Sequence, residues 1–139
     1  TVYGPWGRPD MAPFIFTKAA LSGAEIRVFN NGEQKRDFTY IDDICDAIIA
    51  ICKKDVLFNA ARVFNVGAGK PMHLLKFISI IEKISGSEIR KRYIPAQKGD
   101  VVETFADIRL LSNEINYHPK IGLQQGLEKT IAWYRQYYE

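Results

Sequence analysis

Helical and extended segments alternate along this chain, and that alternation constrains its fold more than any other feature of the sequence. Apolar residues at helical spacing, in two cases with glycine just after the last turn, predict helices. These cover about Met11 to Leu21, the segment that follows Asp42 and Asp43, Met72 to Ser85, Asp107 to Asn116 and Leu123 to Tyr138. Strand patterns occupy Ile26 to Phe29, Asp37 to Ile41, Val63 to Val66 and Ile89 to Ile94. This order predicts an α/β fold (α+β for the chain taken alone), with a small mixed sheet and several helices.

The length of 139 residues allows a single domain, 1–139, with a real core. Hydrophobic residues make up 47% of the chain, which is too many for a disordered segment. The apolar run from Ile48 to Cys52 is far shorter than the roughly 20 residues of a membrane-spanning helix. We therefore expect no membrane partner.

The charge balance is only mildly basic, with 19 Lys and Arg against 16 Asp and Glu. The basic residues are scattered, whereas nucleic-acid proteins gather them on one face, so no nucleic-acid partner is expected. Cys45 and Cys52 lie seven residues apart in a helical pattern, which predicts buried thiols on one helix face. Buried thiols without a disulfide framework favour a reducing compartment and a cytoplasmic location. Neither the cysteines nor His73 and His118 have the spacing of a metal site.

The first residues, Thr1 to Tyr3, form a β-branched and aromatic run that stops at Gly4, and no initiator methionine precedes them. This pattern is typical of the end of a strand. We interpret the chain as part of a longer protein.

Two features that suggest catalysis or nucleotide binding have simpler explanations. The Gly67-Ala68-Gly69-Lys70 turn has Met72 where a dinucleotide fingerprint needs its third glycine, and Pro71 where a P-loop needs Ser or Thr. We interpret it as a turn between a strand and a helix. Glu103 and Asp107 are four residues apart, but nothing in the sequence would shift either pKa, so a solvated helix start is favoured over an acid pair.

Two basic loops are more informative. Lys35 and Arg36 precede a strand that runs into Asp42 and Asp43, which we expect to cap the next helix. Arg36 is either part of an exposed hairpin arm or a fork-shaped donor to a phosphate group. Arg8 lies in a loop stiffened by proline, the kind of loop in which ligand contacts concentrate.

These stretches make the chain resemble the extended short-chain dehydrogenase/reductase family, in particular its NAD-dependent UDP-glucuronate 4-epimerases. The resemblance is carried by the sequences from Thr1 to Met11, Lys35 to Asp43, Val63 to Gly67 and Gly99 to Val101. It runs end to end, but only against the C-terminal, substrate-binding part of such enzymes. The family's N-terminal Rossmann domain, which binds NAD, and its catalytic Tyr-x-x-x-Lys pair are absent from this sequence. The resemblance therefore implies no catalytic residue and no cofactor in this chain, no turnover by the chain alone, and a homodimer for the full-length enzyme.

At the sugar end of the substrate, the resemblance implies that Thr1 and Arg8 hold a glucuronate carboxylate. It places Thr104 near the sugar and, more weakly, Asp10 and Met11 along the cleft that holds the sugar and the diphosphate.

At the nucleotide end, the resemblance implies that the backbone around Arg27, Val28 and Phe29 receives the uracil ring, with Phe29 against its face. Arg36 would bind the diphosphate, and Asp100 would lie near the ribose or the phosphates.

One position departs from the family pattern. Gln97 stands where many relatives have an arginine that donates to phosphate. A neutral amide donates fewer and weaker hydrogen bonds than a guanidinium, so either Gln97 or Lys98 is expected to fill this place.

The resemblance implies two possible functions, and a third of another class stays open. The first is the substrate-binding part of a nucleotide-sugar epimerase that interconverts UDP-glucuronate and UDP-galacturonate at C4 through a 4-keto sugar. The second is a UDP-glucuronate decarboxylase or a related sugar-nucleotide dehydratase. The third, of another class, is a stand-alone module that binds a nucleotide sugar without catalysis.

Overall fold

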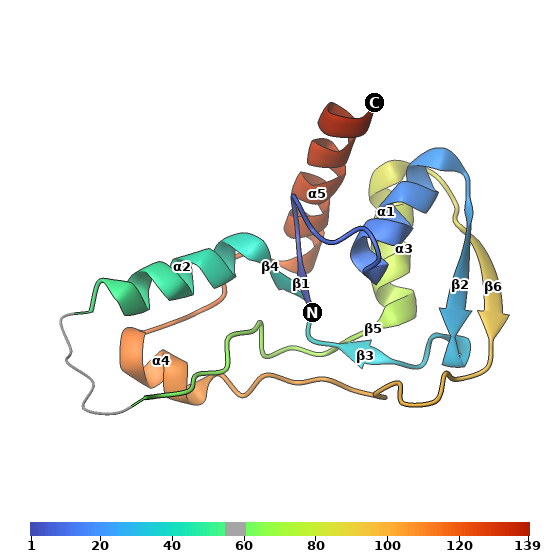
Figure 1. The fold of residues 1–139 in the computed structure, drawn as a ribbon. Helices are drawn as coiled ribbons and strands as arrows, with labels where there is room; N and C mark the ends of the chain where they lie inside the picture. Colours follow the sequence, from blue (N-terminus) through green and yellow to red (C-terminus); the bar gives the residue numbers. More distant parts are fainter. Residues whose placement is uncertain (55–60) are drawn as a thin grey trace.

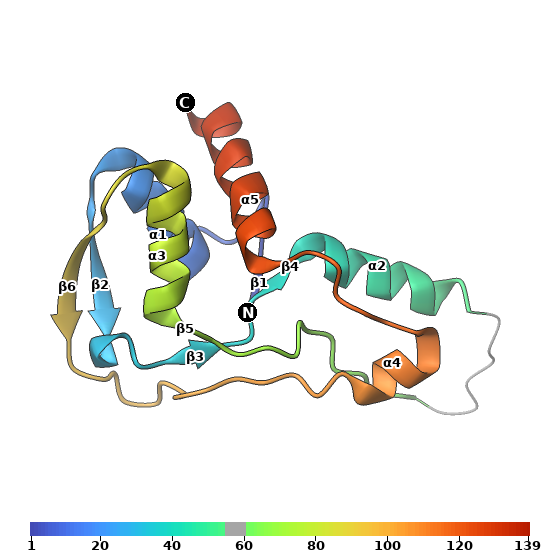
Figure 2. The ribbon, with the colours of Figure 1, turned by 180° about the vertical axis from the view of Figure 1, so that it is seen from behind.

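The computed structural model describes residues 1–54 and 61–139, and its mixed helices and short strands confirm the expected fold class (Figures 1 and 2). The helices are α1 (Ala12–Ser22), α2 (Ile41–Cys52), α3 (Leu74–Ser85), α4 (Arg109–Ile115) and α5 (Leu123–Tyr138). The strands are β1 (Val2–Tyr3), β2 (Glu25–Phe29), β3 (Lys35–Arg36), β4 (Thr39–Tyr40), β5 (Met72–His73) and β6 (Arg90–Ile94), with a short 3₁₀ turn at Asn30–Gly32. Within the described ranges, no helix combines the length and the apolar character needed to cross a bilayer.

The strands form three separate pairs. β2 and β6 are parallel, with Glu25 opposite Arg90 and Phe29 opposite Ile94, and they flank helices α1 and α3 (Figure 1). β1 and β4 are parallel, and β3 and β5 are antiparallel. Of the strand expected at 37–41, only Thr39 and Tyr40 form a strand, β4, while Ile41 begins α2. Asp37 is not part of a strand, and its carboxylate accepts hydrogen bonds from the backbone N–H groups of Gly69 and Ala106.

Glycine ends two helices as the sequence predicts, since Gly23 and Gly86 adopt φ values of 70° and 73° after α1 and α3. The expected cap of α2 is wrong. Tyr40 is the N-cap residue, and no side chain caps it. The Asp43 carboxylate instead accepts hydrogen bonds from the backbone N–H groups of Lys120 and Ile121, at 2.8 and 3.2 Å. These bonds hold the segment that precedes α5 against α2.

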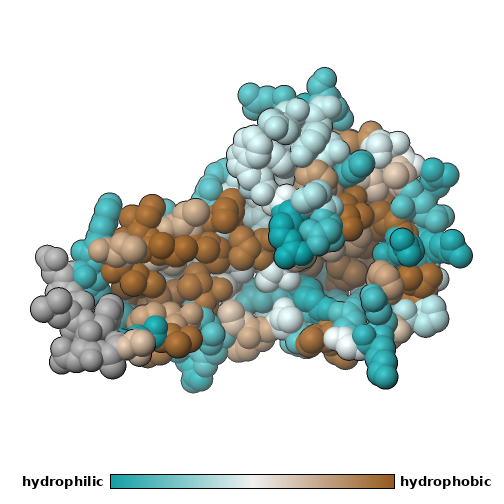
Figure 3. Space-filling view, viewed as in Figure 1, coloured by the Kyte–Doolittle hydropathy of each residue, from teal (hydrophilic) through white to brown (hydrophobic). Residues whose placement is uncertain are grey.

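Helices α2 and α4 form an arm that extends away from the β2–β6 pair (Figures 1 and 2). Ala47, Leu111 and Tyr117 pack inside it. Figure 3 shows apolar side chains gathered over this arm, where Ile48 and Leu110 are about half exposed. The arm therefore presents apolar surface to the solvent.

Two predictions for this region are wrong. Cys45 and Cys52 are both exposed, because the inward face of α2 follows Asp43, Ala47 and Ile51. The segment 63–66 is not a strand: Val63 is 84% exposed, and within 1–54 and 61–139 no strand pairs with the segment. Without a neighbouring ladder, its backbone has no partner that would hold it in a sheet.

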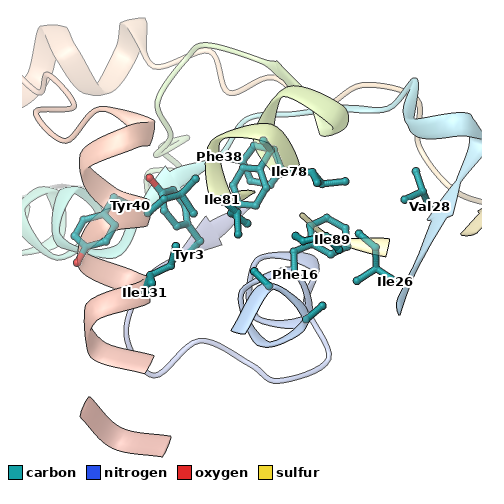
Figure 4. Packing of buried hydrophobic residues seen from close by; sticks show 14 residues of the cluster. Tyr3, Phe16, Ile26, Val28, Phe38, Tyr40, Ile78, Ile81, Ile89 and Ile131 are labelled. Carbon is teal, nitrogen blue, oxygen red and sulfur yellow. The ribbon is translucent and has the colours of Figure 1, made fainter. Parts of the chain in front are cut away.

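The core lies between α1, α3, α5 and the inner face of β2 (Figure 4). Phe77 is fully buried there, and its ring stacks on Phe38 with centroids 4.0 Å apart. Tyr3 and Phe16 meet Phe77 at 6.0 and 6.5 Å. This aromatic cluster joins β1, the β3–β4 connection and two helices, so it fixes the elements on which the candidate site is built.

Replacing Gly126 by alanine is expected to destabilise the protein by about 1–3 kcal/mol, although alanine normally favours a helix. A Cβ at this position would overlap the buried Tyr3 hydroxyl and press on the Tyr40 ring. Gly122, the N-cap residue of α5, has open space around it and is the control for packing, with an expected loss of about 1 kcal/mol or less that comes from the cap position alone. Urea unfolding of both variants measures the difference, and equal midpoints would contradict the packing argument.

Candidate functional site

A cavity of about 580 Å³ opens between α1, β2 and the β3 region, and the Asp100 loop contributes to its wall. Of the residues expected at the substrate, those that line it are Thr1, Asp10, Met11, Arg27, Phe29, Arg36 and Asp100. The apolar part of the wall comes from α1 and the core, including Ile15 and Phe16. The fold thus gathers groups from both the sugar and the nucleotide ends of the predicted site around one hollow.

Arg36 is held in the cavity wall by several acceptors. Its Nη2 donates to Asp100 Oδ1 at 2.7 Å, and its Nη1 donates to the carbonyl oxygens of Lys35 and Val102 at 2.9 and 3.3 Å. The side chain is 18% exposed, so Arg36 is not the exposed hairpin arm that the sequence left open. Lys35 points elsewhere and pairs with Glu103 at 3.5 Å.

Asp100 reaches Arg36 through a tight turn. The Asp100 N–H donates to the Gln97 carbonyl at 3.0 Å, and Gly99 within the turn has a φ of 88°, which favours glycine. The second oxygen of the Asp100 carboxylate accepts a hydrogen bond from Gln34 Nε2 at 3.0 Å. Gln34 was not predicted from the sequence. Because residues two apart in an extended segment lie on the same side, its position before Arg36 could have indicated that the two side chains share a site.

Strand β2 supplies the part of the wall expected to receive uracil. Arg27 and Phe29 line the cavity, while Val28 between them is fully buried in the core, as strand alternation requires. Among the described residues β2 pairs only with β6, so the backbone groups along its other edge have no strand partner. The predicted contact between this backbone and a base stays a prediction.

Arg8 does not line this cavity. It forms a two-pronged pair with Asp10, Nη2 to Oδ2 at 2.6 Å and Nε to Oδ1 at 3.1 Å, and the Arg8 side chain is 73% exposed. The hydrogen bond from Arg8 holds the pKa of Asp10 below its usual range. Arg8 is therefore linked to the cavity only by its ion pair with Asp10, which does line the cavity.

Thr104 and Gln97 also lie outside the cavity wall. The Thr104 hydroxyl accepts a hydrogen bond from the Asp37 N–H at 3.1 Å, and Thr104 borders a neighbouring cavity of about 320 Å³. Thr1 lines both cavities, which therefore adjoin at this residue. Gln97 contributes its backbone carbonyl to the Asp100 turn, and its predicted role at a phosphate stays a prediction.

The glycine-rich turn at 67–70 uses its backbone N–H groups internally. Ala68 donates to Thr39 Oγ1 at 3.0 Å, and Gly69 and Lys70 donate to the Asp37 carboxylate at 3.0 and 3.4 Å. These groups are therefore not available to cradle a pyrophosphate. The described part of the chain does not fit a dinucleotide at this turn.

The two carboxylates weighed as an acid pair bind different bases. Asp107 forms a two-pronged pair with Arg109, with Nε donating to Oδ1 at 2.9 Å and Nη2 to Oδ2 at 2.6 Å, and these hydrogen bonds lower the pKa of Asp107 to about 2. Glu103 pairs with Lys35. Residues 1–54 and 61–139 contain no group of His, Cys, Asp and Glu that could hold a metal ion.

The family model described as "NAD dependent epimerase/dehydratase family" matches residues 1–67. The chain is 42% identical to "Protein CapI" of Staphylococcus aureus, with all of this chain and 46% of that protein covered. It is 37% identical to a "Probable UDP-glucuronate 4-epimerase" of Rhizobium meliloti, with 99% of this chain and 45% of that protein covered.

Among solved structures, the chain is similar to a UDP-glucuronic acid 4-epimerase from Bacillus cereus in complex with UDP-glucuronic acid and NAD. The TM-score is 0.93 at 36% identity, and the match covers 99% of this chain and 44% of that one. The chain thus spans somewhat less than half the length of these relatives.

Proposed function

We propose that this relative of the NAD dependent epimerase/dehydratase family is the substrate-binding part of an NAD-dependent nucleotide-sugar epimerase. The resemblance on which the proposal rests is confirmed, since 99% of the chain aligns with a probable UDP-glucuronate 4-epimerase at 37% identity and with a UDP-glucuronic acid 4-epimerase at 36% identity. The substrate we propose is UDP-glucuronate or its C4 epimer, UDP-galacturonate. The relatives from Rhizobium meliloti and Bacillus cereus are both named for the first of these substrates.

The observation that carries the proposal is the 580 Å³ cavity, with Arg36 and Arg27 in its wall beside Phe29. A guanidinium in a half-enclosed wall suits a diphosphate, because its planar fork donates to two oxygens at once. Phe29 offers an aromatic face to a pyrimidine ring. Arginine side chains that can donate hydrogen bonds to phosphate share one cavity with an aromatic stacking surface. This combination fits a nucleoside diphosphate better than an uncharged ligand.

Thr1, Arg8, Asp10, Met11 and Thr104 make up the proposed sugar side. Arg8 is exposed and paired with Asp10. A sugar carboxylate that binds to Arg8 therefore either replaces Asp10 as its partner or binds beside Asp10. This exchange requires no change in the core.

NAD binding belongs, in this proposal, to a Rossmann domain outside this chain, because the 67–70 turn does not fit a dinucleotide. The chain 1–139 is then one C-terminal substrate-binding domain. We propose no turnover by this chain alone and a homodimer for the full-length enzyme.

Product analysis with the full-length protein, NAD and UDP-glucuronate tests the proposed function. We expect UDP-galacturonate as product. A UDP-pentose with release of CO₂ would show the decarboxylase, a 4-keto-6-deoxy sugar from a UDP-hexose would show the dehydratase, and binding without turnover would show the stand-alone module. Each of these three outcomes would overturn the epimerase assignment.

A further inference from the structure

Gln34 is a buried amide in the cavity wall, only 4% exposed, and it shares a carboxylate with Arg36. Gln34 Nε2 donates to Asp100 Oδ2 at 3.0 Å, and Arg36 Nη2 donates to Asp100 Oδ1 at 2.7 Å. Gln34 and Arg36, two residues apart, therefore bind both oxygens of the Asp100 carboxylate, which lies 64 residues beyond Arg36 in the sequence. The Asp100 side chain cannot rotate without breaking one of these bonds.

The other end of the Gln34 amide has no partner. A carboxylate only accepts hydrogen bonds, so the amide nitrogen faces Asp100 and the Oε1 atom faces away from it. Oε1 is buried and makes no hydrogen bond to any residue within 1–54 and 61–139. A buried carbonyl without a donor destabilises the fold, whereas methionine would fill similar space without an unpaired polar atom. Folding stability therefore does not explain a glutamine here.

The backbone around Gln34 is fixed on both sides. The Gln34 carbonyl accepts a hydrogen bond from Leu74 N–H at the start of α3, at 2.9 Å, and Lys35 N–H donates to the Val102 carbonyl at 2.9 Å. The amide is thus mounted on a rigid segment between α3 and the chain that follows Asp100. Such support is what a group needs in order to orient a neighbour.

We propose that Gln34 is a positioning residue for the diphosphate of the bound nucleotide, acting through Asp100 on Arg36. Gln34 fixes the Asp100 carboxylate, and that carboxylate keeps the Arg36 guanidinium in the cavity wall. Arg36 Nε–H and the second Nη2 hydrogen make no bond to the described residues and are left for phosphate oxygens. This inference rests on the proposed function, since it assigns a role within the same site.

Calorimetric titration of the full-length protein with UDP tests it. Gln34→Met is expected to weaken UDP binding about tenfold while the melting temperature stays equal or rises. Gln34→Glu has the same size but places an acceptor against Asp100, and it is expected to weaken binding at least as much. Gln124→Met is the matched control, because Gln124 makes its hydrogen bond to Glu128 on the α5 surface, away from the cavity.

A double-mutant cycle shows whether Gln34 acts through Asp100. In an Asp100→Ala background, Gln34→Met should cost no further affinity. Unchanged UDP affinity in Gln34→Met, a parallel loss of stability and affinity, or an equal loss in both backgrounds would overturn this role while leaving the proposed function in place. A wild-type protein that does not bind UDP would overturn both.

Discussion

Replacing Arg36 by methionine is expected to weaken UDP binding by about ten- to a hundredfold. A hydrogen bond to a charged group contributes about 1.5–3 kcal/mol, and the side chain sits in the cavity wall with donors still available. Methionine keeps the length of the side chain and removes every donor. Titration calorimetry with UDP measures the change, and the effect should exceed that of any single substitution among the exposed basic residues.

Two further variants separate geometry from charge. Arg36→Lys keeps the positive charge but loses the fork, and it should recover only part of the lost affinity. Arg90→Met removes an exposed arginine from β6 that donates to the Gly23 carbonyl and does not line the cavity, so it should bind UDP like the wild type. If both Met variants lost affinity equally, general charge rather than the cavity would account for binding.

Replacing Phe77 by alanine is expected to lower the free energy of unfolding by about 3–5 kcal/mol. The ring is fully buried, stacks on Phe38 at 4.0 Å and meets Tyr3 edge-on at 6.0 Å. Its removal leaves a hole among rigid aromatic neighbours that cannot close around it. Denaturant unfolding monitored by circular dichroism measures the loss.

Leu75 on the same helix is the control for Phe77. It is 37% exposed, so Leu75→Ala should cost about 1 kcal/mol or less. A similar loss in both variants would show that α3 contributes through helix formation rather than through the aromatic cluster.

The regular elements could be predicted because their signals are local. The glycines after α1 and α3 and the apolar stripe of Leu127, Ile131 and Tyr134 on α5 depend only on nearby residues, and the structure has them where the sequence indicated. Segment 63–66 has the apolar composition of a strand, but a strand needs a neighbour, and composition does not show whether one is present.

The residues of the candidate site could be predicted mainly from the family resemblance. Arg36 and Asp100 are far apart in the sequence, and no local pattern around either residue indicates that the two side chains meet. The sequence did not predict the carboxylates whose hydrogen-bond partners lie far away along the chain. Asp37 accepts hydrogen bonds from the 67–70 turn and from Ala106, although nothing nearby in the sequence indicates this. Asp43 was expected to cap a helix, and it accepts hydrogen bonds from the backbone before α5 instead. Gln34 was hidden for the same reason, because its partner lies 66 residues away.

The ion pair between Arg36 and Asp100 also affects which anions can compete for the cavity. With the carboxylate already against the guanidinium, a small inorganic anion meets a neutralised pair and gains little from entering. A nucleotide adds contacts through its base and sugar, and these can compensate for sharing the arginine. In the proposed nucleotide site, we expect this ion pair to disfavour competition by small inorganic anions such as orthophosphate and chloride.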